Sequence, residues 1–365
     1  MRYVSVLILA MTATVAKGVP SNTERAEGEA PIVANRGEGL WGDTITDRIR
    51  FTETLSIGSE HGQPHEMLWN PRALAVDSAM NIYLLDAVRS ERANAVGACR
   101  VMKFDREGRF LWSRGQRGEG PGEFINPSDV LISPSGELVV VETLGYKKCR
   151  LQYFDTELEY RRSATIAEQM RSVSFLSDGS LLVSEWVKGQ PGISGHYYSA
   201  EGEFLRSFPD DYRYGPLLPE GCGLDGGVFH AQEGRVYMVT PDAYEIREYR
   251  EDGSRVRTIR RDVKLAPAKF KITGDRAGYD PGDGCGPCYS YKDSYLLNFR
   301  FIRRGHGGGD LFLDLFDREG VFLGSYQNPG VSGLVTIDNE GNFYCLVNDP
   351  DPRMLRHAME VVGTP

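Results

Sequence analysis

Four carboxylates occupy the same place in a repeated pattern, at or just after the end of a short apolar stretch. They are Asp86, Glu142, Glu185 and Asp349. Gathered in one ring, such side chains could bind a divalent cation such as calcium, which prefers oxygen ligands. The alternative is a set of structural ion pairs: Asp86 with Arg100, Glu142 with Arg150, and Asp349 with Arg353. Because acid and arginine recur together, whereas catalytic residues need not repeat, we favour the ion pairs.

Two cysteines have the spacing of a dithiol centre, in Cys285-Gly-Pro-Cys288. A thioredoxin-like site would place the first thiolate at the start of a helix, which lowers its pKa. Here the flanking residues YDPGDG and YSYKDSYLL predict a loop with no helix after it. We therefore favour a structural disulfide, between Cys285 and Cys288 or between one of them and Cys222, over a redox catalyst. Cys99 and Cys149 are expected to be packed free thiols, and Cys345 to lie in the core.

Other catalytic and metal-binding patterns have little support. The six histidines are scattered, and only His61 and His65 are close in sequence. Two imidazoles without a third ligand make a weak zinc site. The Asp-x-Asp-x-Asp loop of calcium sites and the Gly-x-Ser-x-Gly elbow of many serine hydrolases are both absent from the sequence. No cofactor is predicted, although a cation such as calcium remains possible at the carboxylates.

The elements that carry these residues form a repeat. Each copy has an alternating apolar strand, a tight turn, a second strand that often ends in an acid, and then a third and a fourth strand. The copies span residues 70–112, 126–160, 173–208, 228–259, 289–326 and 334–361, and their turns recur every 43 to 59 residues. A period of about 50 residues with four strands per copy is typical of a β-propeller. We predict an all-β, six-bladed propeller of four-stranded antiparallel blades.

The last copy lacks a fourth strand. Residues 48–58 (RIRFTETLSIG) have the pattern of a fourth strand and precede the first copy. We predict that they pair with residues 354–361, because this closes the ring and removes an exposed sheet edge.

The innermost strands of such a ring begin at one mouth of the central channel. Register places Arg72, Ser128, Asp129, Arg171 and Ser172 there, and His230 on the equivalent strand of the fourth blade. A mixture of Arg, Asp, Ser and His at a channel mouth could bind a small polar or anionic ligand. The alternative is a solvated rim without a ligand.

The lead-in to the second copy resembles a known repeat. The stretch Gly115-Gln-Arg-Gly-Glu-Gly-Pro-Gly-Glu-Phe124-Ile-Asn-Pro127, with the acid and arginine of the first two copies, resembles the NHL repeat. The resemblance is strong over residues 55–160 and weaker beyond. It implies a six-bladed, NHL-like propeller of the kind common among exported bacterial proteins. Members of that group include enzymes, sensors and binding scaffolds.

The N-terminal residues and the net charge bear on the compartment of the protein and on its partners. Residues 1–16 have the positive start and short apolar run of a signal peptide, and residues 17–44 are polar and Gly/Pro-rich, as in a flexible leader. The propeller would then span residues 45–365. With 42 basic and 51 acidic residues the net charge is −9, which disfavours a nucleic-acid partner. No later segment is apolar enough to span a membrane.

Taken together, these patterns predict a secreted or periplasmic, monomeric binding module for a protein or a small polar ligand. Two enzyme classes are the rivals. One is an NHL-like lyase or calcium-dependent lactonase with its site at the channel mouth. The weaker one is a thiol-disulfide redox protein that uses Cys285 and Cys288.

Overall fold

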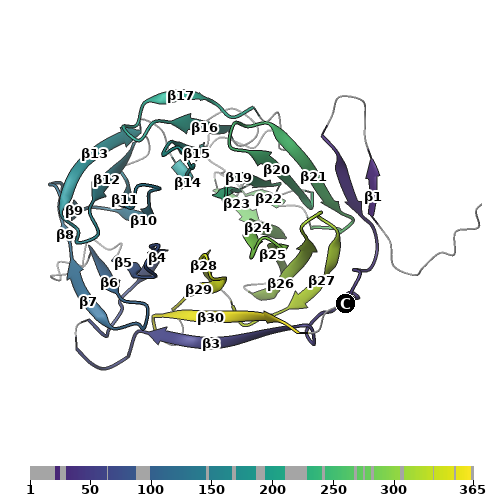
Figure 1. Ribbon diagram of the computed structural model, residues 1–365, viewed down its shortest axis with the longest axis horizontal. Helices are drawn as coiled ribbons and strands as arrows, with labels where there is room; N and C mark the ends of the chain where they lie inside the picture. Colours follow the sequence, from purple (N-terminus) through teal and green to yellow (C-terminus); the bar gives the residue numbers. More distant parts are fainter. Residues whose placement is uncertain are drawn as a thin grey trace, which may run out of the picture.

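The computed structural model describes most of the chain. The described ranges are residues 21–24, 30–63, 65–87, 99–144, 148–166, 170–185, 194–209, 228–240, 243–266, 269–273, 276–280, 283–304, 308–331, 333–348 and 351–362. In these ranges every regular element is a β-strand, and no helix is present that is long and apolar enough to cross a membrane. The strands form six antiparallel blades arranged in a ring, so the predicted six-bladed propeller is confirmed (Figure 1).

Blades 1 to 3 follow one another along the chain. Blade 1 comprises β4 (Pro71–Val76), β5 (Ile82–Ala87), β6 (Cys99–Phe104) and β7 (Phe110–Arg114). Blade 2 comprises β10 (Pro127–Ile132), β11 (Leu138–Thr143), β12 (Cys149–Phe154) and β13 (Tyr160–Ile166). Blade 3 comprises β14 (Met170–Phe175), β15 (Leu181–Glu185), β16 (Ser194–Tyr198) and β17 (Phe204–Ser207). Between blades 1 and 2, β8 (Gln116–Arg117) and β9 (Glu123–Phe124) form a short parallel pair.

Blades 4 to 6 complete the ring. Blade 4 contains β18 (Val228–Gln232), β19 (Arg235–Val239), β20 (Glu245–Arg250) and β21 (Arg255–Arg261). Blade 5 contains β24 (Gly284–Tyr291), β25 (Tyr295–Arg304), β26 (Gly308–Asp317) and β27 (Phe322–Gln327). Blade 6 contains β28 (Leu334–Ile337), β29 (Asn342–Val347), β30 (Arg353–Val361) and β3 (Ile49–Ile57). β22 (Lys269–Thr273) and β23 (Arg276–Asp280) form a separate hairpin between blades 4 and 5.

The second strand of each blade is apolar on both faces because both faces are buried. In β11, Leu138 and Val140 pack toward blade 1, while Val139 and Val141 pack toward blade 3. Successive side chains of a strand point to opposite faces, so one continuous apolar run serves two inter-blade cores. This explains why these strands lack the apolar–polar alternation of a half-exposed sheet.

The ring closes as predicted, with one strand from each end of the chain. β3 pairs antiparallel with β30, with Ile49 opposite Val361 and Ile57 opposite Met354. The two strands lie side by side in Figure 1, the purple of the first next to the yellow of the second. The outer edge of blade 6 is therefore supplied from the start of the chain.

Part of the segment predicted as a flexible leader is structured. β1 (Ser21–Glu24) pairs with β2 (Ile32–Asn35), and β2 pairs in parallel with β21, so blade 4 gains two outer strands. The chain then runs along β27 of blade 5, where Trp41 N–H donates to the Leu323 carbonyl at 2.9 Å. We call residues 30–47 the strap. It follows the outside of blades 4 and 5 before β3 enters blade 6 (Figure 1).

Candidate functional site

Two of the predicted acid–arginine pairs are present, and the carboxylate of each is buried. The Asp86 carboxylate is buried, lies 2.8 Å from the Arg100 guanidinium, and accepts a hydrogen bond from Asn70 N–H at 2.7 Å. Glu142 is equally buried and lies 2.6 Å from Arg150. Each arginine also donates to carbonyls of the loop that leads into the innermost strand. The pairs thus hold that loop in place, and the carboxylate oxygens of Asp86 and Glu142 accept hydrogen bonds from protein groups.

The other two predicted acids, Glu185 and Asp349, fall at positions whose side chains the structure does not describe. The backbone of Glu185 lies at the end of β15, but its side chain, like all of Asp349, lies outside the described residues.

Blade 5 carries a variant that sequence reasoning missed. Arg300 on β25 occupies the place that Asp86 has in blade 1, because each lies opposite the residue that precedes the bulge of the innermost strand. Arg300 lies 3.0 Å from the buried Asp314 on β26. Arg261 of blade 4 reaches the same carboxylate at 3.1 Å. Burial alone would raise the pKa of Asp314, but the two guanidinium groups outweigh it and hold the pKa below its usual value. The charges have exchanged strands, so a search for an acid at the end of the second strand does not find this pair.

The innermost strands share a backbone feature at the predicted channel mouth. Five of the six have a register shift near their first residue, where extra residues are inserted opposite the second strand. The inserted residues are Arg72, Ser128, Arg171, Gly286 with Pro287, and Val335. A β-bulge redirects side chains locally, and bulges are common at barrel rims. Three of the residues predicted to line the channel mouth thus lie at bulges.

The predicted channel-mouth residues occupy different surroundings. Arg72 donates from Nε to the Ala87 carbonyl at 3.1 Å. The Ser172 hydroxyl lies 2.6 Å from that of Ser184. The backbone of Arg171 is on β14, and its side chain is outside the description.

His230 lies at the junction of blades 4 and 5. Its imidazole packs against the ring of Tyr289, with 4.8 Å between the ring centroids. Burial lowers the pKa of His230 to about 4, so the side chain is neutral at pH 7. It therefore acts as a packing residue between two blades.

Asp129 is the predicted residue with the most unusual electrostatics. Burial raises the pKa of this carboxyl to about 6. One oxygen accepts a hydrogen bond from Val130 N–H at 2.8 Å, and no described cation pairs with it. Within the described ranges no hydrogen bond or ion pair links Asp129, Ser172 and His230 to one another, and no three His, Cys, Asp or Glu side chains gather as metal ligands.

The disulfide predicted between Cys285 and Cys288 is not formed, and the predicted loop is in fact strand β24. An extended chain rises about 3.3 Å per residue, so residues three apart lie beyond the roughly 4.4–6.8 Å that a disulfide spans between Cα atoms. Both thiols pack in the core between blades 4 and 5. Burial raises the pKa of Cys285 to about 12, so this thiol stays protonated. Cys222 lies outside the described residues.

The remaining cysteines match the expectation. Cys99, Cys149 and Cys345 are buried free thiols.

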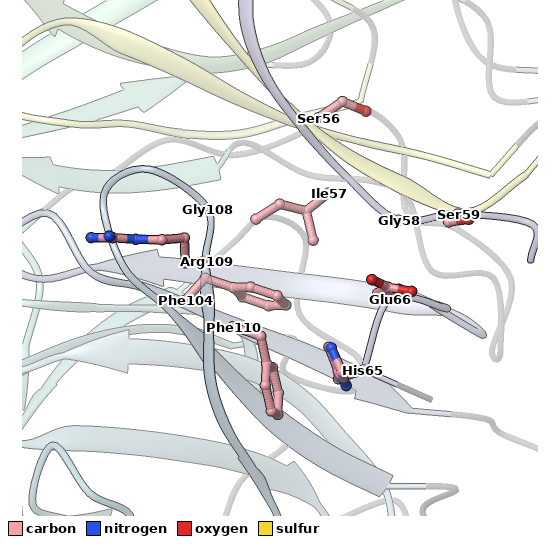
Figure 2. A pocket seen from close by; sticks show the side chains of 10 residues that line it. All are labelled: Ser56, Ile57, Gly58, Ser59, His65, Glu66, Phe104, Gly108, Arg109 and Phe110. Carbon is pink, nitrogen blue, oxygen red and sulfur yellow. The ribbon is translucent and has the colours of Figure 1, made fainter. Parts of the chain in front are cut away.

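A pocket of about 440 Å³, which the sequence did not suggest, opens on the outer rim where blade 6 meets blade 1. Its lining comes from β3, from the loop after β3, and from the hairpin between β6 and β7. Figure 2 shows Phe104, Phe110 and His65 around the space, with Glu66 at its edge. We call this the rim pocket.

Among the comparisons with known proteins, the one with solved structures supports the fold. No family model matches the chain, and no curated protein is similar to it in sequence. The chain is similar to a candidate exported protein of Bacteroides fragilis NCTC 9343, with a TM-score of 0.57 and 12% identity over 91% of this chain and 100% of that one.

Two further solved structures are similar at lower scores. One is a protein of unknown function from Bacteroides caccae (TM-score 0.43, 14% identity, 71% of this chain and 86% of that one). The other is the periplasmic gluconolactonase of Pseudomonas aeruginosa (TM-score 0.44, 14% identity, 81% and 86%). The similarity to the Bacteroides fragilis protein, at 12% identity, supports the β-propeller fold alone, and the NHL-repeat type stays a prediction.

Proposed function

We propose that this protein is an exported β-propeller that binds a small polar ligand at the mouth of its channel. Asp129 is the observation that carries the proposal. A carboxylate that is partly buried and has no described counter-charge is costly in the free protein. A ligand that brings a hydrogen-bond donor or a positive charge to Asp129 would remove that cost.

Export rests on the first 16 residues, whose positive start and short apolar run are typical of a signal peptide. The solved structures with this fold include a periplasmic protein, which agrees with that compartment. The acid and arginine pairs, repeated in two blades, support an NHL-like repeat. Monomeric behaviour remains part of the proposal.

The test is a binding measurement on the mature chain. Calcium chloride, ethanolamine and glucose represent a metal ion, an organic cation and a neutral polyol, and calorimetry measures each against the native protein and Asp129→Asn. A probe that binds the native chain and loses about tenfold or more in affinity in the variant supports the proposal. If calcium is that probe, the calcium-dependent enzyme classes become the leading candidates. If no probe binds, or if binding is equal in both proteins, the assignment of Asp129 is wrong.

A further inference from the structure

One side of the rim pocket is apolar and could cover part of a small organic molecule. Ile57 and Phe104 are buried and form its inner side, while Phe110 is half-buried at its wall. A volume of about 440 Å³ falls within the range of about 300–1,000 Å³ typical of small-molecule sites. The pocket lies on the outer rim, so it is separate from the channel mouth.

Aromatic rings make one wall of the rim pocket. The His65 imidazole stacks on Phe110 with 4.4 Å between centroids and 22° between planes. Phe104 meets Phe110 edge to face at 5.9 Å. The faces of aromatic rings attract ammonium and guanidinium groups, so this wall favours a cation over an anion.

The charge at the pocket edge favours the same class of ligand. One oxygen of Glu66 accepts a hydrogen bond from Gln63 N–H at 2.7 Å, which orients the carboxylate. Arg109, the one guanidinium among the lining residues, is held by Asp105 at 2.6 Å and by Glu107 at 3.2 Å. Figure 2 shows its side chain turned away from Glu66. Glu66 therefore has no described cation facing it across the pocket.

We propose that the rim pocket binds a small organic cation, namely a primary amine or guanidinium on an apolar body. The positive group lies between Glu66 and the aromatic wall, and the apolar body covers Ile57 and Phe104. This site is independent of the function proposed for Asp129.

Three probes of the same size and different charge test the proposal: benzylamine, benzyl alcohol and benzoate. Calorimetry on the full mature chain should show saturable binding of benzylamine, about tenfold weaker binding of benzyl alcohol, and no binding of benzoate. Glu66→Gln should weaken benzylamine about tenfold and leave benzyl alcohol unchanged. Phe110→Leu should weaken both, and its melting temperature checks that the variant is folded.

The control variant is Glu107→Gln. The Glu107 carboxylate pairs with Arg109 and does not line the pocket, so this variant should bind benzylamine like the native chain. Benzoate binding as tight as benzylamine, or no saturable binding of benzylamine at ~10 mM, would overturn the proposal. So would equal affinities in Glu66→Gln and the native chain. Loss of benzylamine binding in Asp129→Asn alone would place the amine in the channel instead.

Discussion

At the scale of single residues, buried and exposed ion pairs of the same chemistry have different roles. Arg100 and Asp86 are enclosed and hold the loop before β4 through both side-chain and backbone bonds. Arg109 and Asp105 lie at the surface in a hairpin turn. Water screens the second pair but not the first, so only the first should matter for stability.

Replacing Arg100 with Met should therefore destabilise the protein strongly. The variant leaves the Asp86 carboxylate buried without its counter-charge, and we expect a loss of about 3–5 kcal/mol in the free energy of unfolding. Arg109→Met is the matched control and should leave it nearly unchanged, because water screens this exposed pair. Urea denaturation of both variants measures the difference, and equal losses would refute the structural role of the buried pair.

Asp129 gives a pH-dependent prediction. Its pKa in the folded protein, about 6, lies above the ordinary value of 3.8. The folded state therefore holds the proton more tightly, and stability falls as pH rises from 4 through 6. Above pH 6 the charged form costs up to about 3 kcal/mol, at about 1.4 kcal/mol per pKa unit. Asp129→Asn should raise the free energy of unfolding at pH 7.5 and leave it nearly unchanged at pH 4.

Denaturation of the native chain and Asp129→Asn at both pH values tests this. Asp47→Asn, at an exposed position, serves as the control for replacing an acid by its amide. A variant less stable than the native protein at pH 7.5 would show that Asp129 has a stabilising partner.

At the scale of elements, the sequence predicted what depends on periodicity and missed what depends on long-range pairing. Turn spacing and apolar runs were enough for the six blades and for β3 closing the ring on β30. Pro287 and two glycines in the segment of β24 predict a loop. Proline is nevertheless tolerated on edge strands and at bulges, and β24 is an edge strand with a bulge at Pro287. β2 has only four residues, and the partner that joins it to blade 4 lies more than 200 positions away, so the sequence around it does not predict this pairing.

The strap should stabilise the ring through Asn35. This buried side chain donates to the Gly320 carbonyl at 3.0 Å and accepts from Phe322 N–H at 2.8 Å, which joins the strap to blade 5. Asn35→Ala leaves both backbone groups unsatisfied and should cost about 1–3 kcal/mol. Thermal and urea unfolding measure the loss, with the exposed Glu38→Ala as a control expected to be neutral. A neutral Asn35→Ala would mean that the strap is not coupled to the blades.

Removing β30 should abolish the fold. A chain that ends at Asn348 leaves β3 without its partner and exposes the edge of β29, so we expect aggregation or unfolding. A chain that ends at Val362 keeps β30 and should remain soluble with an unchanged circular-dichroism melting curve. A soluble, stable protein ending at Asn348 would contradict ring closure through β3.

At the scale of the whole molecule, the closed ring positions both candidate sites. The channel mouth exists only where innermost strands of several blades meet, and the rim pocket uses β3, the strand that closes the ring. The fold alone does not assign an activity, because propellers carry many. The proposed function therefore depends on the state of one side chain, the carboxyl of Asp129 near the start of β10.

The most direct measurement is an NMR titration of the Asp129 side-chain carboxyl carbon in the mature protein without ligand. Comparison with the spectrum of Asp129→Asn assigns the signal. The account predicts a midpoint near pH 6, as burial without a counter-charge requires. A midpoint near the ordinary value of about 4 would show that Asp129 is solvated or paired, and would contradict the proposed ligand site at the channel mouth.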